Sequence, residues 1–177
     1  MNPELERVSG LIREVADFPQ PGVLFRDLSP LLADAEGFRV VVGEMAAHGT
    51  GADGGVDVVV GIEARGFLLG AAVAHQLGLG VVGVRKPGKL PAVAHRIDYA
   101  LEYGTATLEL PEGTLRAGSR VLVVDDVLAT GGTVEAACAL VEHAEAEVSA
   151  VSVVMELAAL NGRERLAGRK VRSLLTV

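Results

Sequence analysis

Short runs of valine and other apolar residues recur along the chain and alternate with segments of helical periodicity. The apolar runs predict five strands, at residues 56–61, 81–84, 121–124, 148–155 and 171–175. Helical patterns occupy residues 4–16, 35–48, 66–77, 133–146 and, as a short helix, 162–166. Because the runs lack polar alternation, we expect these strands to be buried on both faces, which is typical of a parallel sheet covered by helices. The order of elements therefore predicts an α/β fold with a mostly parallel five-stranded sheet flanked by helices.

Two segments interrupt this alternation. Residues 17–30, ahead of the first strand, are rich in turn-forming residues. Between the second and third strands, residues 98–103 and 105–110 flank Gly104 and predict a two-stranded ribbon. A long excursion of this kind is usually a functional lid or a disordered loop. We find no repeat, linker or low-complexity tract, so a single domain over residues 1–177 is predicted.

Composition excludes several classes of protein. The 177 residues carry a formal net charge of −7 and only 3% are aromatic, which disfavours a protein that coats a nucleic acid. A single cysteine cannot form an internal disulfide, and no apolar run is long enough to span a membrane. The 50% hydrophobic content is too high for disorder. We therefore expect a cytoplasmic domain that binds neither nucleic acid nor membrane.

The net charge is unevenly distributed. Residues 64–97 contain no acidic residue, and their basic residues are Arg65, Arg85, Lys86, Lys89 and Arg96. One basic segment in an acidic protein suggests a local anionic ligand. A solvated charged face is the alternative interpretation.

Three unusual segments follow predicted strands, at residues 63–66, 85–89 and 125–133. Ligands of open parallel sheets bind beyond the carboxyl ends of the strands, so the three segments are expected to share one crevice. In the third, Ala129, Thr130, Gly131, Gly132 and Thr133 open a helix, where unpaired N–H groups and the helix dipole favour a phosphate. Asp125 and Asp126 would accept hydrogen bonds from sugar hydroxyls or help hold a cation. An ordinary glycine turn with a helix cap is the alternative.

Several strings of the sequence match a known family. VLVVDDVLATGGT at residues 121–133 closely resembles the phosphoribosyl diphosphate (PRPP) motif of type I phosphoribosyltransferases. DFPQPGVLFRDLSPLL at residues 17–32 is similar to the N-terminal signature of the adenine-specific members, and GIEARGF, VRKPGKLP and LEYG follow in the expected order. The resemblance covers the chain from about Ile12 to Leu175. It implies the type I phosphoribosyltransferase fold, with a small N-terminal hood at about 1–34 and a flexible lid at about 87–110.

The resemblance also implies an activity. It predicts a pentosyltransferase of purine salvage that converts adenine and PRPP to AMP and diphosphate. Mg²⁺ would be held mainly by oxygens of PRPP or diphosphate, with no dedicated metal ligand from the protein. A homodimer is expected. The alternatives are a phosphoribosyltransferase for hypoxanthine, guanine or xanthine and, less favoured, a regulator that senses PRPP without catalysis.

Site residues carry over from the family motifs. The resemblance implies that residues 129–133 hold the 5′-phosphate, that Asp125 and Asp126 bind the ribose hydroxyls, and that Arg65, Arg85, Lys86 and Lys89 neutralise the diphosphate. Phe25 and Leu128 would sandwich adenine, whose polar edge is read by backbone groups around Leu24 and Arg26. Glu102, a catalytic candidate with Arg65, would contact the imidazole edge of the base, and Tyr103 would order the lid. The family also implies a cis peptide bond between Glu63 and Ala64.

Overall fold

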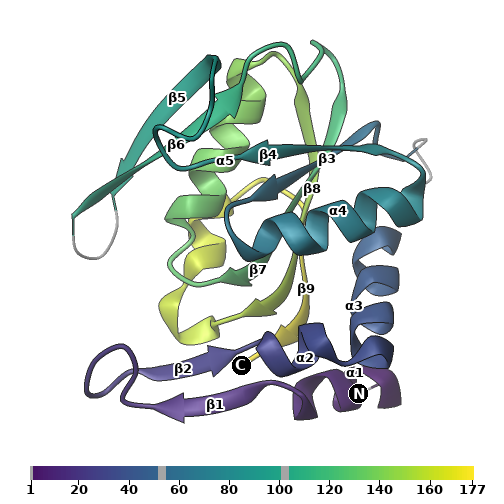
Figure 1. Cartoon of the computed structure of the whole chain (residues 1–177), viewed down its shortest axis with the longest axis vertical. Helices are drawn as coiled ribbons and strands as arrows, with labels where there is room; N and C mark the ends of the chain where they lie inside the picture. The colour runs from purple at the N-terminus through teal and green to yellow at the C-terminus, as the bar shows by residue number, and fades with distance from the viewer. Residues whose placement is uncertain (1, 52–54, 101–103) are drawn as a thin grey trace. The chain divides into compact units, whose positions relative to one another are not determined.

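Five parallel strands form the predicted sheet (Figure 1). In spatial order they are β4 (Gly80–Val84), β3 (Val58–Ile62), β7 (Arg120–Leu128), β8 (Glu147–Glu156) and β9 (Val171–Thr176). The computed structural model describes residues 2–51, 55–100 and 104–177. It falls into two compact units, Met1–Glu44 and Met45–Val177, and the sheet belongs to the second. The predicted α/β fold with a five-stranded parallel sheet is confirmed, whereas a single domain with a hood at about 1–34 stays a prediction.

Two helices connect the strands at the centre of the sheet. Helix α4 (Arg65–Leu77) links β3 to β4, and α5 (Gly132–His143) links β7 to β8. The two connections run in opposite directions along the sheet, so right-handed crossovers place α4 and α5 on opposite faces. Consecutive residues such as Val59 and Val60 are fully buried, as expected for strands covered on both faces.

The predicted ribbon between the second and third strands is present. It consists of β5 (Val93–Ala100) and β6 (Thr105–Pro111), which pair in antiparallel fashion. Its first strand begins five residues earlier than the 98–103 predicted, because residues 93–97 alternate between the two faces like an edge strand rather than forming an apolar run. Leu108 and Leu110 of β6 are buried in the core of the second unit. After β8 come two 3₁₀ helices, η1 (Ala158–Leu160) and η2 (Gly162–Leu166), the second at the predicted short helix.

The first unit corrects one prediction. The helix expected over residues 4–16 is wrong in its second half: α1 (Pro3–Gly10) ends at a glycine, a poor helix former. Residues Arg13–Ala16 form strand β1, which pairs with β2 (Leu24–Asp27) in the segment predicted as turns. Opposite charges face each other across this pair, with Arg13 2.5 Å from Asp27 and Arg26 3.2 Å from Glu14. Such cross-strand pairs favour a hairpin over a continued helix.

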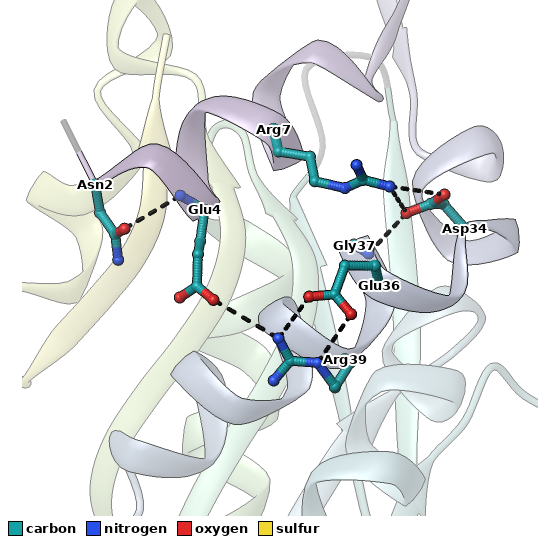
Figure 2. Close-up of polar contacts among 7 residues, drawn as sticks. All are labelled: Asn2, Glu4, Arg7, Asp34, Glu36, Gly37 and Arg39. Carbon is teal, nitrogen blue, oxygen red and sulfur yellow. Dashed lines mark hydrogen bonds and ion pairs between the residues drawn. The ribbon is translucent and has the colours of Figure 1, made fainter.

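The first unit also contains helices α2 (Ser29–Ala33) and α3 (Ala35–Ala47), the latter continuing past the end of the unit. Figure 2 shows how charged side chains join α1 to the start of α3. Arg7 reaches Asp34 at 2.9 Å, and Asp34 accepts the N–H of Gly37 at 2.8 Å. Arg39 binds Glu36 at 2.6 Å and lies 3.6 Å from Glu4. Because these ion pairs are exposed, each is expected to stabilise the unit only slightly.

Cys138 is a core residue, as its apolar neighbours in the sequence indicate. It lies fully buried in α5. Burial raises the pKa of its thiol to about 12, so little reactive thiolate forms at neutral pH. Within the described ranges, no helix combines the length and apolarity needed to cross a membrane.

Candidate active site

The three predicted segments all leave the sheet at its carboxyl edge. Residues 63–64 join β3 to α4, Arg85 follows β4, and residues 129–131 join β7 to α5. Strand β3 pairs with both β4 and β7. The connection through α4 leads from β3 to one side of the sheet and the connection through α5 leads from β7 to the other, so the chain changes direction between β3 and β7. In doubly wound sheets the crevice at such a switch point is where ligands bind. The structure therefore brings together segments that are more than sixty residues apart in the sequence.

Asp125 and Asp126 lie inside β7 rather than after it, which corrects the strand end predicted at Val124. β7 continues to Leu128 because β8 supplies partners along this stretch, with Asp125 opposite Val153. Both acids are buried, at 8% and 7% exposure. The Asp125 carboxylate accepts the N–H of Asp126 at 2.9 Å. Burial, and then the neighbouring Asp126 carboxylate, raise the pKa of Asp125 well above its usual value of 3.8.

Arg65, the first residue of α4, pairs with the second of these acids. Its Nε lies 2.7 Å from Oδ2 of Asp126. The close approach of α4 to β7 depends on Gly66, since a Cβ at this position would lie 2.9 Å from both Oδ1 of Asp125 and the carbonyl oxygen of Val124. The peptide bond between Glu63 and Ala64 is cis, as the family resemblance predicted. One arginine and two buried acids thus form a polar group at the switch point.

The glycine loop, which we define as residues 129–133, connects β7 to α5. Gly131 has a φ of +87° and caps the helix, which begins at Gly132. A small pocket is lined by residues of this loop together with Asp125 and Val127. The loop is braced by η2, because a Cβ on Gly131 would overlap the backbone carbonyl of Gly162. Free N–H groups at the start of α5 and the helix dipole make this loop suitable for a phosphate.

The ribbon approaches the same loop. The hydroxyl of Thr133 donates to the hydroxyl of Tyr99 in β5 at 3.3 Å. A Cβ on Gly132 would lie 3.0 Å from the carbonyl oxygen of Ala100. Part of the predicted lid, at about 87–110, therefore contacts the start of α5 directly.

The basic loop, which we define as residues 85–89, lies beside Glu63. Nε of Arg85 is 3.4 Å from the Glu63 carboxylate, and its guanidinium lies 5.6 Å from the centre of the Phe67 ring. Glu63 also accepts the N–H of Lys86 at 2.9 Å. That N–H, followed by the Arg85 guanidinium, lowers the pKa of Glu63. Over the residues that the structure describes, Lys86 and Lys89 form no ion pair, so their ammonium groups are available to an anion.

The remaining predicted residues are spread over other parts of the chain. Leu128 is fully buried at the end of β7. In the first unit, Leu24 is exposed, Phe25 contacts the ring of Phe18 edge-to-face at 5.1 Å, and Arg26 is paired with Glu14. The predicted catalytic Glu102 and the lid residue Tyr103 lie outside the described residues. The roles assigned to all of these residues stay predictions.

The burial of Asp125 leads to a pH-dependent prediction. The pKa of Asp125 is higher in the folded protein than in the unfolded chain. The free energy of unfolding therefore falls as the pH rises from the unfolded pKa through the folded one, because the unfolded chain loses this proton more easily. Asp125→Asn, which keeps an oxygen for the Asp126 N–H, is therefore expected to raise Tm at pH 7 by a few degrees, about what 1 kcal/mol produces in a domain of this size. The gain should shrink towards pH 4. Thermal melts at both values test this, and a lower Tm at pH 7 would contradict it.

Comparison with known proteins places these features in context. A phosphoribosyl transferase domain matches residues 32–173. An adenine phosphoribosyltransferase of Saccharopolyspora erythraea is 64% identical over 176 residues, which cover 99% of this chain and 94% of that protein. The crystal structure of the adenine phosphoribosyltransferase from Thermoanaerobacter pseudethanolicus superposes with a TM-score of 0.93 at 43% identity, covering 98% of this chain and 99% of that one.

A third relative was solved with ligands. The adenine phosphoribosyltransferase of Saccharomyces cerevisiae, complexed with adenine and an imino-altritol bisphosphate, has a TM-score of 0.93 and 36% identity. The match covers 99% of this chain and 100% of that one. The similarity therefore extends over both compact units and includes every segment of the carboxyl edge described above.

Proposed function

This chain belongs to the adenine phosphoribosyltransferase family, and on that premise we propose that it transfers the phosphoribosyl group of PRPP to adenine, giving AMP and diphosphate. One observation carries the proposal. The glycine loop at the start of α5 begins three residues after Asp126 of the buried Asp125–Asp126 pair, and Arg65 Nε lies 2.7 Å from Asp126. The glycine loop would bind a phosphate, the two acids would accept hydrogen bonds from sugar hydroxyls, and Arg65 would supply a positive charge, which together match a phosphorylated ribose.

Residues 129–133 bind the 5′-phosphate in this proposal. The loop offers backbone N–H groups at a helix N-terminus, and glycine at 131 lets the chain turn tightly at positive φ. Asp125 and Asp126, at the end of the same strand, accept hydrogen bonds from the ribose hydroxyls. Anchoring both ends of the sugar fixes the position of its C1 atom, and this positioning is itself a large part of catalysis in transfer reactions.

The chemical step exchanges one bond at C1 for another. The bond from C1 to the diphosphate oxygen breaks and its electron pair leaves with the diphosphate, while N9 of adenine bonds to C1 and releases its proton. Negative charge grows on the leaving group, so cations placed there lower the barrier. We assign this role to Arg65, Arg85, Lys86 and Lys89. Contact of Glu102 with the imidazole edge of the base stays a prediction, as does the positioning of adenine by Leu24, Phe25, Arg26 and Leu128.

Mg²⁺ would enter this site bound to the oxygens of PRPP or diphosphate. In the described portion of the chain, no three His, Cys, Asp or Glu side chains are grouped so as to hold a metal ion. Mg²⁺ commonly takes one or two carboxylates and completes its shell with phosphate oxygens and water. Asp125 and Asp126, which precede the glycine loop, would be the nearest carboxylates to the bound ribose in this proposal. When bound to the diphosphate, the ion would add positive charge to the leaving group. A homodimer in the cytoplasm remains part of the proposal.

A side-by-side assay of purines tests the function. The purified protein is incubated with PRPP, Mg²⁺ and either adenine, hypoxanthine, guanine or xanthine, and nucleotide and diphosphate are measured. We expect AMP from adenine and at least a hundredfold lower turnover with the 6-oxo purines, because a site built to pair with one base edge leaves polar groups unpaired with another. Turnover of guanine without adenine would favour the alternative base. PRPP binding with no turnover of any purine would favour a sensor.

A further inference from the structure

Two acidic residues hold the backbone of the basic loop. The N–H of Lys86 donates to Oε2 of Glu63 at 2.9 Å, and the N–H of Gly88 donates to Oε2 of Glu109 at 3.3 Å. The two carboxylates come from different places, one after β3 and the other in β6 of the ribbon. The loop is therefore fixed at two backbone positions, two residues apart, by elements that are distant in sequence.

Glu109 is the more unusual of the two because it is buried. Its side chain is only 6% exposed, although it is charged. Its backbone exchanges hydrogen bonds with that of Arg85, at 2.9 and 2.7 Å, so it lies directly beside the start of the basic loop. A buried carboxylate is costly unless its oxygens have partners. One oxygen receives the Gly88 N–H, and the other faces Arg96, its cross-strand neighbour, at 3.7 Å.

The ion pair with Arg96 does not explain why a carboxylate is buried at this position. The Arg96 side chain is 58% exposed and the separation is long, so this ion pair contributes little. The negative charge of Glu109 also opposes anion binding, since a carboxylate beside the basic loop weakens the attraction of that loop for a diphosphate. What Glu63 and Glu109 provide is geometry. Each accepts a backbone N–H group of the basic loop, and Glu63 also lies 3.4 Å from Nε of Arg85. The ammonium groups of Lys86 and Lys89 have no ion pair to any described residue.

We propose that Glu109 is a positioning residue for diphosphate binding, which acts by holding the Gly88 N–H and so keeps the basic loop in one conformation. The proposal rests on the function proposed above. A loop that is already ordered loses less conformational freedom when the anion binds, which favours affinity without any direct contact from Glu109. The ribbon and the diphosphate site are thereby coupled through one buried side chain.

Three variants of Glu109 and one control test the proposal. Glu109→Ala removes the acceptor, Glu109→Asp withdraws it by one methylene, and Glu109→Gln keeps an acceptor oxygen at the same place without charge. Glu112→Ala is the matched control, because Glu112 follows β6 closely but is exposed, and its side chain forms no hydrogen bond or ion pair with any described residue. Steady-state kinetics give KM for PRPP and for adenine separately. Calorimetric titration of Mg²⁺-diphosphate into the free protein gives affinity without turnover, and thermal melts report folding.

We expect Glu109→Ala and Glu109→Asp to raise KM for PRPP and weaken diphosphate affinity by up to about tenfold, the upper range for one ordinary hydrogen bond. KM for adenine should change by less than about threefold. Glu109→Gln should recover most of the affinity, and Glu112→Ala should match the wild type.

Three results would overturn the proposal. Unchanged PRPP and diphosphate binding in a folded Glu109→Asp would show that the loop does not need this bond. An equal loss for both substrates would show a purely structural role. A Glu109→Gln variant as weak as Glu109→Ala would show that charge, not positioning, matters. A different result would contradict the proposed function alone. In that case the wild type would use PRPP with a purine other than adenine, while Glu109→Asp would still raise KM for PRPP.

Discussion

Replacing Gly131 with alanine is expected to lower kcat/KM for PRPP by about a hundredfold or more, the loss typical of a reacting group misplaced by about 1 Å. Gly131 adopts a φ of +87°, and a Cβ there would overlap the carbonyl of Gly162 in η2. The loop and η2 must move apart to relieve this overlap. Such a shift displaces the N–H groups that we assign to the 5′-phosphate, so phosphate binding and the alignment of C1 are lost together.

Gly118→Ala is the matched control for this variant. Gly118 also has a positive φ, +75°, but no atom lies within 4 Å of a Cβ built on it, and it precedes β7 at the opposite edge of the sheet. Both substitutions carry a conformational cost of roughly 1–2 kcal/mol. Denaturation should therefore show lower stability in both variants, whereas kinetics should show a loss only in Gly131→Ala. Equal losses of activity in the two variants would contradict the role of the glycine loop.

Asp126→Asn is expected to lower kcat/KM by about a hundredfold while the protein stays folded. The substitution removes the charge that Arg65 faces at 2.7 Å, and it weakens the acceptor assigned to the ribose hydroxyls. Hydrogen bonds to a charged group are each worth about 1.5–3 kcal/mol, and about 1.4 kcal/mol corresponds to a factor of ten in rate. Arg65→Ala should produce a loss of similar size, because it removes the other half of the same pair.

An aspartate–arginine pair at the other end of the same strand provides the control. Asp57 pairs with Arg120, the first residue of β7, at 2.8 Å. Asp57→Asn removes the same charge from a more exposed aspartate–arginine pair far from the carboxyl edge. Its kcat/KM should equal that of the wild type, as measured by AMP formation over a range of PRPP concentrations. Full activity of Asp126→Asn, or a comparable loss in Asp57→Asn, would refute the role assigned to the Asp125–Asp126 pair.

The valine runs predicted the sheet because burial on both faces leaves a continuous apolar signal. They placed the end of β7 too early, at Val124, because two adjacent acids are unusual in a buried strand. The pairing of β1 with β2 was missed for another reason. It depends on contacts between residues 13–16 and 24–27, which the helical pattern of residues 4–16 does not reveal.

The site followed the same division. Motifs predicted the glycine loop, the acids and the cations, since each lies in a short stretch of sequence at or near the carboxyl end of a strand. The function of Glu109 could not be predicted in this way. Its partners, Gly88 and Arg96, are brought to it by the folding of the ribbon onto the basic loop. The alternation of TLEL in β6 places Glu109 and the two leucines on different faces of the strand, which predicts that Glu109 is exposed. In the structure all three residues are buried, and the burial of Glu109 could not be predicted from the sequence.

The most direct test of the account is a crystal structure of the protein with AMP bound. We predict that the 5′-phosphate accepts hydrogen bonds from backbone N–H groups of residues 129–133, and that the ribose hydroxyls lie within about 3 Å of the carboxylates of Asp125 and Asp126. A phosphate bound elsewhere, or hydroxyls turned away from these two acids, would contradict the proposed site.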